Sequence, residues 1–226
     1  MIGDGIWIVI PAYNEGDVVA DVVASVRARY SNVVVVDDCS DDATGIAAMS
    51  TGAVVLRHPV NLGQGAALQT GIRYALAMGA QIVITFDSDG QHRVEDIGIL
   101  VDRQRETGAD VVAGSRFLGR AEGIPRLRRM VLKLATVFTR MTTGVRLSDA
   151  HNGLRLFTRR AAERIRIRQN RMAHASEIID QIGALKLSVA EAPVTIVYTP
   201  YSLGKGQRLG NAVNILVELF VARLNR

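Results

Sequence analysis

Cysteine and aromatic residues are scarce in this chain, which has one cysteine, Cys39, and 5% Phe, Trp and Tyr among its 226 residues. A lone cysteine excludes a disulfide within the chain and is typical of a protein from a reducing compartment. No run of about 18 apolar residues occurs, so we expect no transmembrane helix. Residues 1–15 lack a basic segment followed by a long apolar run, and we therefore expect no secretory signal.

The chain also lacks a large excess of one charge. It has 27 Lys and Arg and 22 Asp and Glu, which gives a net charge of +5. This mild basicity favours an anionic partner such as a nucleotide, a polyprenyl phosphate or a phospholipid surface. We do not expect nucleic-acid binding, since the arginines cluster on one predicted helix, aromatics are few and no recognition motif occurs. A hydrophobic fraction of 48% is sufficient for a folded core.

Short apolar segments rich in β-branched residues alternate with longer segments of helical spacing. Strands are predicted at 6–10, 33–37, 53–57, 81–86 and 110–114. Helices are predicted between them at 15–30, 41–50, 64–79 and 94–108. The strands are too apolar to face water, so we expect both of their faces to be buried. The alternation predicts an α/β domain with a parallel, doubly wound sheet.

Polar, charged or glycine-rich segments follow four of the five predicted strands. Ligands of such sheets bind beyond the carboxyl ends of the strands. We therefore expect the segments PAYNE, DDCSDD, HPVNLGQG and DSDGQH to meet in one crevice.

Two acids, Asp87 and Asp89, end the fourth predicted strand on either side of Ser88. On an extended strand they would point the same way and could bracket one hard divalent cation, Mg²⁺ or Mn²⁺, that bridges a diphosphate. Gln91 could add a carbonyl oxygen. The alternative is an Asx turn in which Asp89 caps the following helix.

Six segments occur in an order that resembles a known family. They are VIPAYNE, VVVVDDCSDDAT, NLGQGAALQTGIRYA, FDSDGQH, AGSRF and SDAHNGLRLF. Together they resemble glycosyltransferase family 2, with a GT-A fold, and within it the dolichyl- or polyprenyl-phosphate sugar transferases. The resemblance covers roughly residues 6–200. It implies a GT-A glycosyltransferase domain at 1–208, with a donor half at about 1–117 and an acceptor half at about 118–208.

The resemblance also implies the residues of a nucleotide-sugar site. Pro11, Tyr13 and Glu15 would line the base and ribose, and Asp38 would meet the edge of the base. Gly63, Gln64 and Gly65 would form a loop over the nucleotide, with Asp87 and Ser88 beside it. Asp87, Asp89 and Gln91 match the metal ligands of the family.

A basic amphipathic helix is expected within 123–149, where an apolar stripe lies beside arginines. In the family that this chain resembles, such a helix rests at the membrane and arginines hold the lipid phosphate, so Arg116 and Arg126 are candidates. The helix could instead pack on the core with a solvated basic face, or contact a membrane-protein partner.

The segment SDAHNGLRLF would lie beside the sugar. Asp149 and Arg155 match the pattern that this segment has in the family, and His151 and Asn152 are further candidates for contacting the acceptor. His151 could also be a base, an additional metal ligand or a structural histidine. An alcohol acceptor would need a base, for which Asp149 is the candidate, whereas a phosphate acceptor would not. Glu177, on a helix predicted at 171–182, would contact a sugar hydroxyl or the acceptor, or only supply charge near the start of that helix.

A basic loop at 198–208 and an amphipathic helix at 209–226 end the chain. Lys205 and Arg208 could close over the diphosphate and offset the charge of the leaving group. The alternative is an exposed basic loop without such a role. The helix could dock on the sheet, dimerise or touch lipid.

The resemblance implies an inverting, metal-dependent glycosyltransferase. The donor would be a nucleotide-diphosphate sugar and the acceptor a polyprenyl phosphate, in envelope polysaccharide or glycoconjugate synthesis. We expect a cytoplasmic protein, peripheral at the inner face of the cell membrane, with a homo-oligomer as an option. Two alternatives stay open, a sugar-phosphate nucleotidyltransferase and a non-catalytic nucleotide-sugar-binding subunit of a membrane complex.

Overall fold

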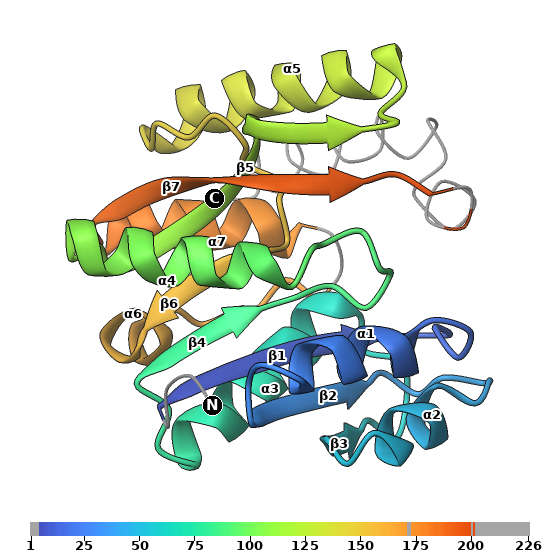
Figure 1. Cartoon of the computed structure of the whole chain (residues 1–226). Helices are drawn as coiled ribbons and strands as arrows, with labels where there is room; N and C mark the ends of the chain where they lie inside the picture. The colour runs from blue at the N-terminus through green and yellow to red at the C-terminus, as the bar shows by residue number, and fades with distance from the viewer. Residues whose placement is uncertain (1–4, 171–172, 200, 202–226) are drawn as a thin grey trace.

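The computed structural model describes residues 5–170, 173–199 and 201 (Figure 1). It contains one sheet with the strand order β3-β2-β1-β4-β6-β5-β7. The strands are β1 (Ile6–Ala12), β2 (Asn32–Asp37), β3 (Val54–Arg57), β4 (Ile82–Thr85), β5 (Val111–Glu122), β6 (Arg155–Thr158) and β7 (Val189–Val197). All neighbouring pairs are parallel except those of β6, which runs antiparallel to β4 and β5. The expected α/β fold with a mostly parallel sheet is confirmed.

Helices cover both faces of this sheet. They are α1 (Val19–Arg27), α2 (Thr44–Ser50), α3 (Gln64–Ala77), α4 (Glu95–Thr107), α5 (Arg126–Thr143), α6 (Arg159–Arg164) and α7 (His174–Ala184). The helices α1, α2 and α4 share one hydrophobic cluster with the sheet, and α3, α6 and α7 share a second cluster on its other face. Glycines in the left-handed region, Gly108 and Gly144, end α4 and α5.

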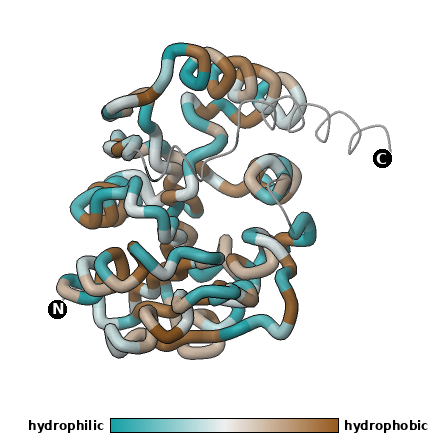
Figure 2. The backbone as a smooth tube through the Cα atoms, turned by 90° about the vertical axis from the view of Figure 1, so that its right-hand side faces the viewer, coloured by the Kyte–Doolittle hydropathy of each residue, from teal (hydrophilic) through white to brown (hydrophobic). Residues whose placement is uncertain are grey.

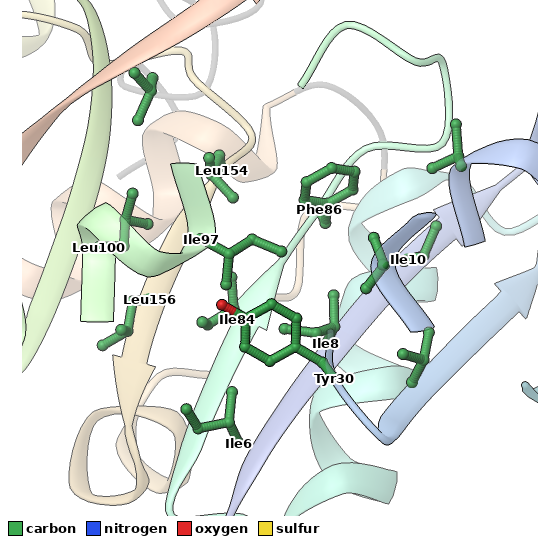
Figure 3. Packing of buried hydrophobic residues seen from close by; sticks show 14 of the residues in the cluster. Ile6, Ile8, Ile10, Tyr30, Ile84, Phe86, Ile97, Leu100, Leu154 and Leu156 are labelled. Carbon is green, nitrogen blue, oxygen red and sulfur yellow. The ribbon is translucent and has the colours of Figure 1, made fainter. Parts of the chain in front are cut away.

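Alternate side chains of β1 point to opposite faces of the sheet, and both faces are buried. Ile6, Ile8 and Ile10 contribute to the first cluster, where Figure 3 shows them with Ile84 and Ile97. The intervening residues of β1 contribute to the second cluster. Because both faces bury apolar side chains, the strand cannot shift its register by one residue without exposing one of the two sets.

The order of the sheet reverses beside β1. From β1 the chain moves outward to β2 and β3, and it then crosses back to β4 on the other side of β1. The carboxyl ends of β1, β2 and β4 lie at one edge, which Figure 2 views face-on with hydrophilic loop segments gathered there. This is the position at which open α/β sheets bind ligands.

Two strands, β6 and β7, were not predicted from the sequence. The β7 segment contains Pro193, which cannot donate a hydrogen bond and therefore argues against a central strand. The structure places β7 at the edge of the sheet, where a proline is tolerated. The edge strand β3 also departs from the prediction of two buried faces, because its residues are half-buried or exposed.

Helix α5 exposes an apolar stripe rather than burying it. Its exposed apolar residues are Leu127, Met130, Leu134, Val137 and Met141. The residues that α5 buries against the rest of the domain are Ala135, Thr136 and Thr139. The core-packed alternative for this stripe is therefore wrong. Among the described residues, no helix is long and apolar enough to cross a membrane.

Candidate functional site

The two acids Asp87 and Asp89 lie in a turn just beyond β4, at the edge where β1 and β2 end. One oxygen of Asp87 accepts a hydrogen bond from Gln64 Nε2 at 3.2 Å and the other lies 3.0 Å from His92 Nε2. Asp89 Oδ1 accepts from the backbone N–H of Gln91 at 3.0 Å, which forms the Asx turn. The suggested capping of α4 by Asp89 is wrong, because that helix has no side-chain cap.

The pKa values of the two carboxylates are shifted in opposite directions. Burial raises the pKa of Asp87, but the hydrogen bond and charge of His92, with His174 and Arg155, outweigh it and hold this pKa below its usual range. Burial and the neighbouring Asp87 charge raise the pKa of Asp89 to about 6. Two acids whose pKa values are driven apart in this way would gain from a shared cation. Carboxylates with an amide oxygen from Gln91 are ligands suited to Mg²⁺ or Mn²⁺.

The raised pKa of Asp89 predicts an unusual dependence of stability on pH. Between pH 4 and 6 the folded protein keeps a proton that the unfolded chain, with its ordinary Asp pKa of 3.8, has released. The free energy of unfolding should therefore fall as the pH rises through this window. Mn²⁺ must displace the proton, so its affinity should fall about tenfold for each pH unit below 6.

The check is a set of urea unfolding curves from pH 4 to 7, with and without Mn²⁺, on wild type and Asp89→Asn. The difference between the two proteins isolates Asp89 from the other titrating groups. A difference that does not vary with pH would show that Asp89 titrates normally.

His92 completes the surroundings of Asp87, and the sequence analysis did not identify it. Its side chain is only 3% exposed, and its ring packs on Phe86 with 5.4 Å between ring centroids. The hydrogen bond from His92 fixes the rotamer of Asp87. The signal that could have revealed it is its position directly after Gln91, in the same loop as both acids.

Gly153 lies directly against the carboxylate of Asp87. A Cβ built on this glycine would overlap Asp87 Oδ2. Its own carbonyl accepts a hydrogen bond from Thr85 Oγ1 at 2.6 Å, which fixes the close approach. The SDAHNGLRLF segment therefore packs against Asp87 through Gly153, and its expected place beside a sugar stays a prediction.

Gly153→Ala should displace the Asp87 carboxylate and weaken Mn²⁺ binding by about tenfold or more, since a poorly placed ligand loses one charge-assisted bond. Calorimetric titration with Mn²⁺ measures this. Gly98→Ala in α4 is the matched control, because a Cβ there meets nothing within 4 Å. Equal Mn²⁺ affinity in the two variants would contradict the proposed role of Asp87.

Asp38 supports the predicted nucleotide loop through hydrogen bonds to its backbone. Its side chain is 2% exposed, and it accepts hydrogen bonds from the backbone N–H groups of Leu62 at 2.9 Å and Gly63 at 2.6 Å. His58 Nδ1 lies 2.7 Å from the same carboxylate. Gly63 has φ 97°, a conformation suited to glycine. Asp38 therefore supports this loop, and its expected contact with the edge of a base stays a prediction.

Helix α3 begins at Gln64, immediately after this loop. Gly65 donates its backbone N–H to the carbonyl of Asn170 at 2.8 Å, so a segment of the acceptor half closes on the loop. A Cβ on Gly65 would overlap the carbonyl of Gln169, which explains the glycine there. The hydrogen bond from Gln64 to Asp87 therefore brings the loop of Gly63, Gln64 and Gly65 to the acid pair.

The PAYNE segment forms the opposite side of the site. Ser88 Oγ donates to the carbonyl of Pro11 at 2.8 Å and so ties the acid turn to the end of β1. Tyr13 is 44% exposed at the rim. Glu15 is buried, and its Oε2 accepts a hydrogen bond from Tyr201 Oη at 2.7 Å. The predicted contacts of these residues with a base and ribose stay predictions.

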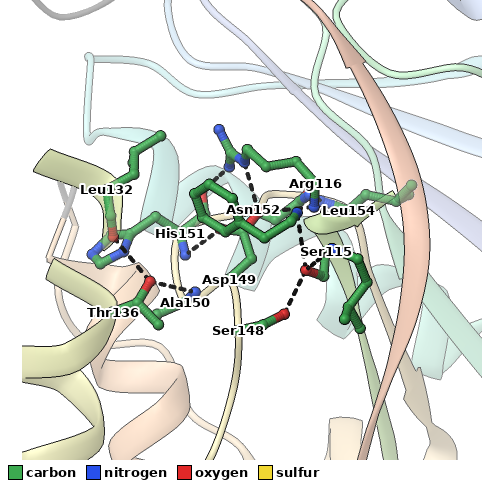
Figure 4. Close-up of polar contacts among 12 residues, drawn as sticks. Ser115, Arg116, Leu132, Thr136, Ser148, Asp149, Ala150, His151, Asn152 and Leu154 are labelled. Atoms are coloured by element: carbon green, nitrogen blue, oxygen red, sulfur yellow. Dashed lines mark hydrogen bonds and ion pairs between the residues drawn. The ribbon is translucent and has the colours of Figure 1, made fainter. Parts of the chain in front are cut away.

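Arg116 and Asp149 form a buried ion pair, which Figure 4 shows with its neighbours. Arg116 Nε lies 2.6 Å from Asp149 Oδ2, Nη1 donates to Tyr198 Oη at 2.6 Å, and Nη2 donates to the carbonyl of His151 at 3.2 Å. Asp149 is 2% and Arg116 8% exposed. The expected roles, Arg116 holding a lipid phosphate and Asp149 acting as a base, stay predictions. Both residues hold the SDAHNGLRLF segment in place.

His151 and Asn152 carry buried polar atoms without a partner in the described part of the chain. These are both ring nitrogens of His151 and Nδ2 of Asn152. Burial, aided by Arg155, Arg116 and His174, lowers the pKa of His151 to about 4, although Asp149 opposes this shift. His151 is therefore neutral at pH 7. Buried polar groups without partners are expected where a ligand binds.

Arg155, the first residue of β6, is also buried. It donates to the carbonyls of Asn152 at 3.0 Å and Ala150 at 2.9 Å, and burial lowers its pKa to about 10. These bonds shape the segment that carries His151. The expected contact of Arg155 with an acceptor stays a prediction.

The remaining predicted residues are separated from the acid pair or lie outside the described residues. Glu177 accepts hydrogen bonds from the backbone of Arg168 and Gln169, at 2.9 Å and 2.8 Å, so it supports a loop rather than facing a ligand. Arg126 is exposed at the start of α5. Lys205, Arg208 and the helix predicted at 209–226 lie outside the described residues.

A glycine loop and paired acids lie at the switch point of the α/β sheet, the position at which such sheets bind ligands. The profile described as glycosyl transferase family 2 matches residues 7–166. The chain belongs to this family and is a glycosyltransferase.

Curated relatives cover nearly all of the chain. A UDP-N-acetylglucosamine–dolichyl-phosphate N-acetylglucosaminyltransferase of Methanococcus voltae is 27% identical over 98% of this chain and 97% of its own length. A polyprenol monophosphomannose synthase of Mycolicibacterium smegmatis is 28% identical over 91% and 82%. An uncharacterized protein of Methanocaldococcus jannaschii is 34% identical over 98% and 93%. These names support the polyprenyl-phosphate branch of the family.

Solved structures share the fold at lower identity. Glucosyl-3-phosphoglycerate synthase of Mycobacterium tuberculosis matches with a TM-score of 0.75 and 21% identity, over 99% of this chain and 80% of that one. The same enzyme in complex with Mn²⁺ and UDP-glucose matches with a TM-score of 0.75, over 99% and 79%. These matches confirm the predicted GT-A-like fold.

Proposed function

We propose that this glycosyltransferase moves a sugar from a nucleotide-diphosphate sugar to a polyprenyl phosphate, with a divalent cation and with inversion at the anomeric carbon. The observation that carries the proposal is the pair Asp87 and Asp89, beside the glycine loop and against Gly153, which follows His151 and Asn152 in the chain. The relatives from Methanococcus and Mycolicibacterium are named for lipid-phosphate acceptors. Solved relatives are described with Mn²⁺ or Mg²⁺ and UDP compounds.

The donor would lie across the carboxyl ends of β1, β2 and β4. Tyr13 offers an exposed ring at the rim for the base, and Pro11 and Glu15 line the same side. Gly63 and Gly65 allow the backbone to approach the diphosphate closely. Lys205 and Arg208 are proposed to cover the leaving group.

Asp87, Asp89 and Gln91 would hold the cation. When bound, a cation there neutralises charge that develops on the departing diphosphate. Among the described residues no group of three or more His, Cys, Asp or Glu could form a closed metal site. Two carboxylates with open positions suit a metal that takes its other ligands from phosphates and water.

The reaction would be a single displacement. An oxygen of the acceptor phosphate forms a bond to the anomeric carbon as the bond from that carbon to the diphosphate oxygen breaks. The bonding electrons leave with the nucleoside diphosphate, and attack opposite the leaving group inverts the centre. A phosphate acceptor is already ionised and needs no general base. This agrees with an Asp149 that is buried and paired with Arg116. The neutral ring of His151 and the amide of Asn152 could donate to sugar hydroxyls.

The acceptor half would meet the lipid through α5. Its exposed apolar residues follow the i, i+3, i+7 spacing of one helix face, and Arg126, Arg129, Lys133 and Arg140 are exposed beside them. A helix of this kind can lie in a bilayer interface, with its cations near lipid phosphates. We propose a peripheral protein at the inner face of the membrane, with donor and acceptor halves at about 1–117 and 118–208 and a terminal helix at 209–226.

The test is transfer from a panel of labelled nucleotide sugars to polyprenyl phosphate in detergent, with Mn²⁺ or EDTA. Label from one donor should enter the lipid fraction only when the cation is present, and NMR of the product should show the inverted anomer. Formation of a nucleotide sugar from a nucleoside triphosphate and a sugar phosphate would favour the nucleotidyltransferase. Binding of a nucleotide sugar without turnover, even with membranes added, would favour the non-catalytic subunit.

A further inference from the structure

A cavity of about 610 Å³ opens beside α3, on the sheet face opposite α1 and α4. Its lining is Gln69, Arg73, Leu76, Arg166, Ile167 and Arg168. None of these residues belongs to the proposed donor, metal or acceptor site. The volume is within the range of about 300–1,000 Å³ found for small-molecule sites.

The charge of this cavity is entirely positive. Three of its lining residues are arginines and none is an acid. The chain pairs other arginines nearby, since Arg159 lies 2.8 Å from Glu163 and Arg160 lies 3.5 Å from Asp110.

The three cavity arginines form no ion pair among the described residues. Arg166 donates only to backbone carbonyls, those of Ala162 and Ile165. Glu177 hydrogen-bonds this loop, but it does so through the backbone N–H groups of Arg168 and Gln169. The guanidinium groups therefore keep their charge for an anion.

Gln69 adds an unused hydrogen-bond donor to the cavity lining. Its Oε1 accepts from the backbone N–H of Ile167 at 2.6 Å, which fixes the orientation of the amide. Its Nε2 is buried and has no partner in the described part of the chain. The three arginines are exposed, whereas this N–H is closed to solvent, so an anion held by the arginines reaches it only when the Gln69 side chain moves.

We propose that this cavity binds the phosphate or diphosphate group of a small molecule, at a site separate from the donor site. Arginine side chains bind phosphate oxygens through paired N–H donors, and Nε2 of Gln69 would contribute a further bond. Leu76 and Ile167 give the lining an apolar part, which suits an organic group attached to the phosphate. The proposal does not depend on the identity of the sugar donor or acceptor.

The site joins two segments that are distant in the chain. Gln69 and Arg73 belong to α3, whereas Arg166 and Arg168 belong to the connection between α6 and α7. The same connection accepts the N–H of Gly65 through Asn170. An anion bridging the arginines would therefore fasten this connection to the helix that begins at the proposed nucleotide loop.

The experiment is calorimetric titration of the full chain with inorganic pyrophosphate, in EDTA and at constant ionic strength. Arg73→Gln/Arg166→Gln should bind at least about tenfold more weakly than wild type, because each change removes a charge-assisted bond. Arg103→Gln/Arg105→Gln is the matched control, since it removes the same charge from exposed positions of α4. Asp89→Asn should retain the binding, because the cavity does not include the acid pair.

The phosphate could come from a soluble molecule or from a lipid headgroup. A second arm therefore measures flotation of the same proteins with phosphatidylcholine vesicles that contain phosphatidic acid. Flotation lost only in Arg73→Gln/Arg166→Gln, without pyrophosphate binding, would assign the phosphate to a lipid. Equal pyrophosphate binding by that variant and wild type, or loss of binding in Asp89→Asn alone, would overturn the proposal. Absence of binding in both arms would overturn it as well.

Discussion

Replacing Asp89 with asparagine is expected to lower the rate of sugar transfer by about 10²–10³-fold, and to abolish stabilisation by nucleotide with Mn²⁺. The amide keeps the shape of the side chain and can still accept the N–H of Gln91, so the turn should persist. The lost property is the negative charge, which the raised pKa shows to be costly beside Asp87 without a cation. The measurements are initial rates at saturating donor and the thermal midpoint with and without Mn²⁺.

Asp102→Asn is the control for this substitution. Asp102 is an exposed acid on α4 whose ion pair within the described residues is with Arg105, so its loss should leave the rate and the Mn²⁺ effect unchanged. Asp89→Asn with wild-type rates would return the acid to the role of a turn residue. A loss of rate with an unchanged Mn²⁺ effect would place Asp89 in catalysis but not at the metal.

The donor side of this site is well predicted by local sequence patterns. Buried parallel strands have strong apolar signals, and the polar segments that follow β1, β2 and β4 must reach one edge of the sheet. The acid turn after β4 could therefore be placed beside the glycine loop without coordinates. The direction of the two acids was derived incorrectly from strand alternation, because β4 ends at Thr85 and the acids lie in a turn.

The supporting residues were harder to predict because their partners are far away in the chain. His58 lies 20 residues from Asp38, and Tyr198 lies 82 residues from Arg116. No periodicity or spacing rule joins such pairs. The sequence analysis gave Asp38 and Arg116 ligand contacts and made Asp149 a candidate base, but it did not predict the long-range hydrogen bonds that these residues form in the structure.

In the acceptor half, the sequence did not predict whether the apolar face of α5 is buried or exposed. The amphipathic spacing of α5 predicts a helix with one apolar face, but it does not say whether that face is buried or exposed. The answer depends on the position of α5 beyond the end of β5, where Ala135 and Thr139 face the domain and the larger apolar residues do not. Only the structure distinguishes a core helix from a surface available to lipid.

The ion pair between Arg116 and Asp149 predicts the largest stability effect in the molecule. Arg116→Met should lower the free energy of unfolding by about 3–5 kcal/mol, because Asp149 would stay buried without its partner. Asp149→Asn leaves Arg116 with Tyr198 and the carbonyl of His151, so its cost should be smaller. Urea unfolding at pH 7 measures both variants.

The double variant Arg116→Met/Asp149→Asn separates support from catalysis. If the residues act on each other, the double variant should be more stable than the sum of the two single losses predicts. Arg103→Met on the surface of α4 controls for loss of a charge. An additive double variant would contradict the pairing. A transfer rate that fell in Asp149→Asn while stability and Mn²⁺ affinity stayed unchanged would restore Asp149 as a base.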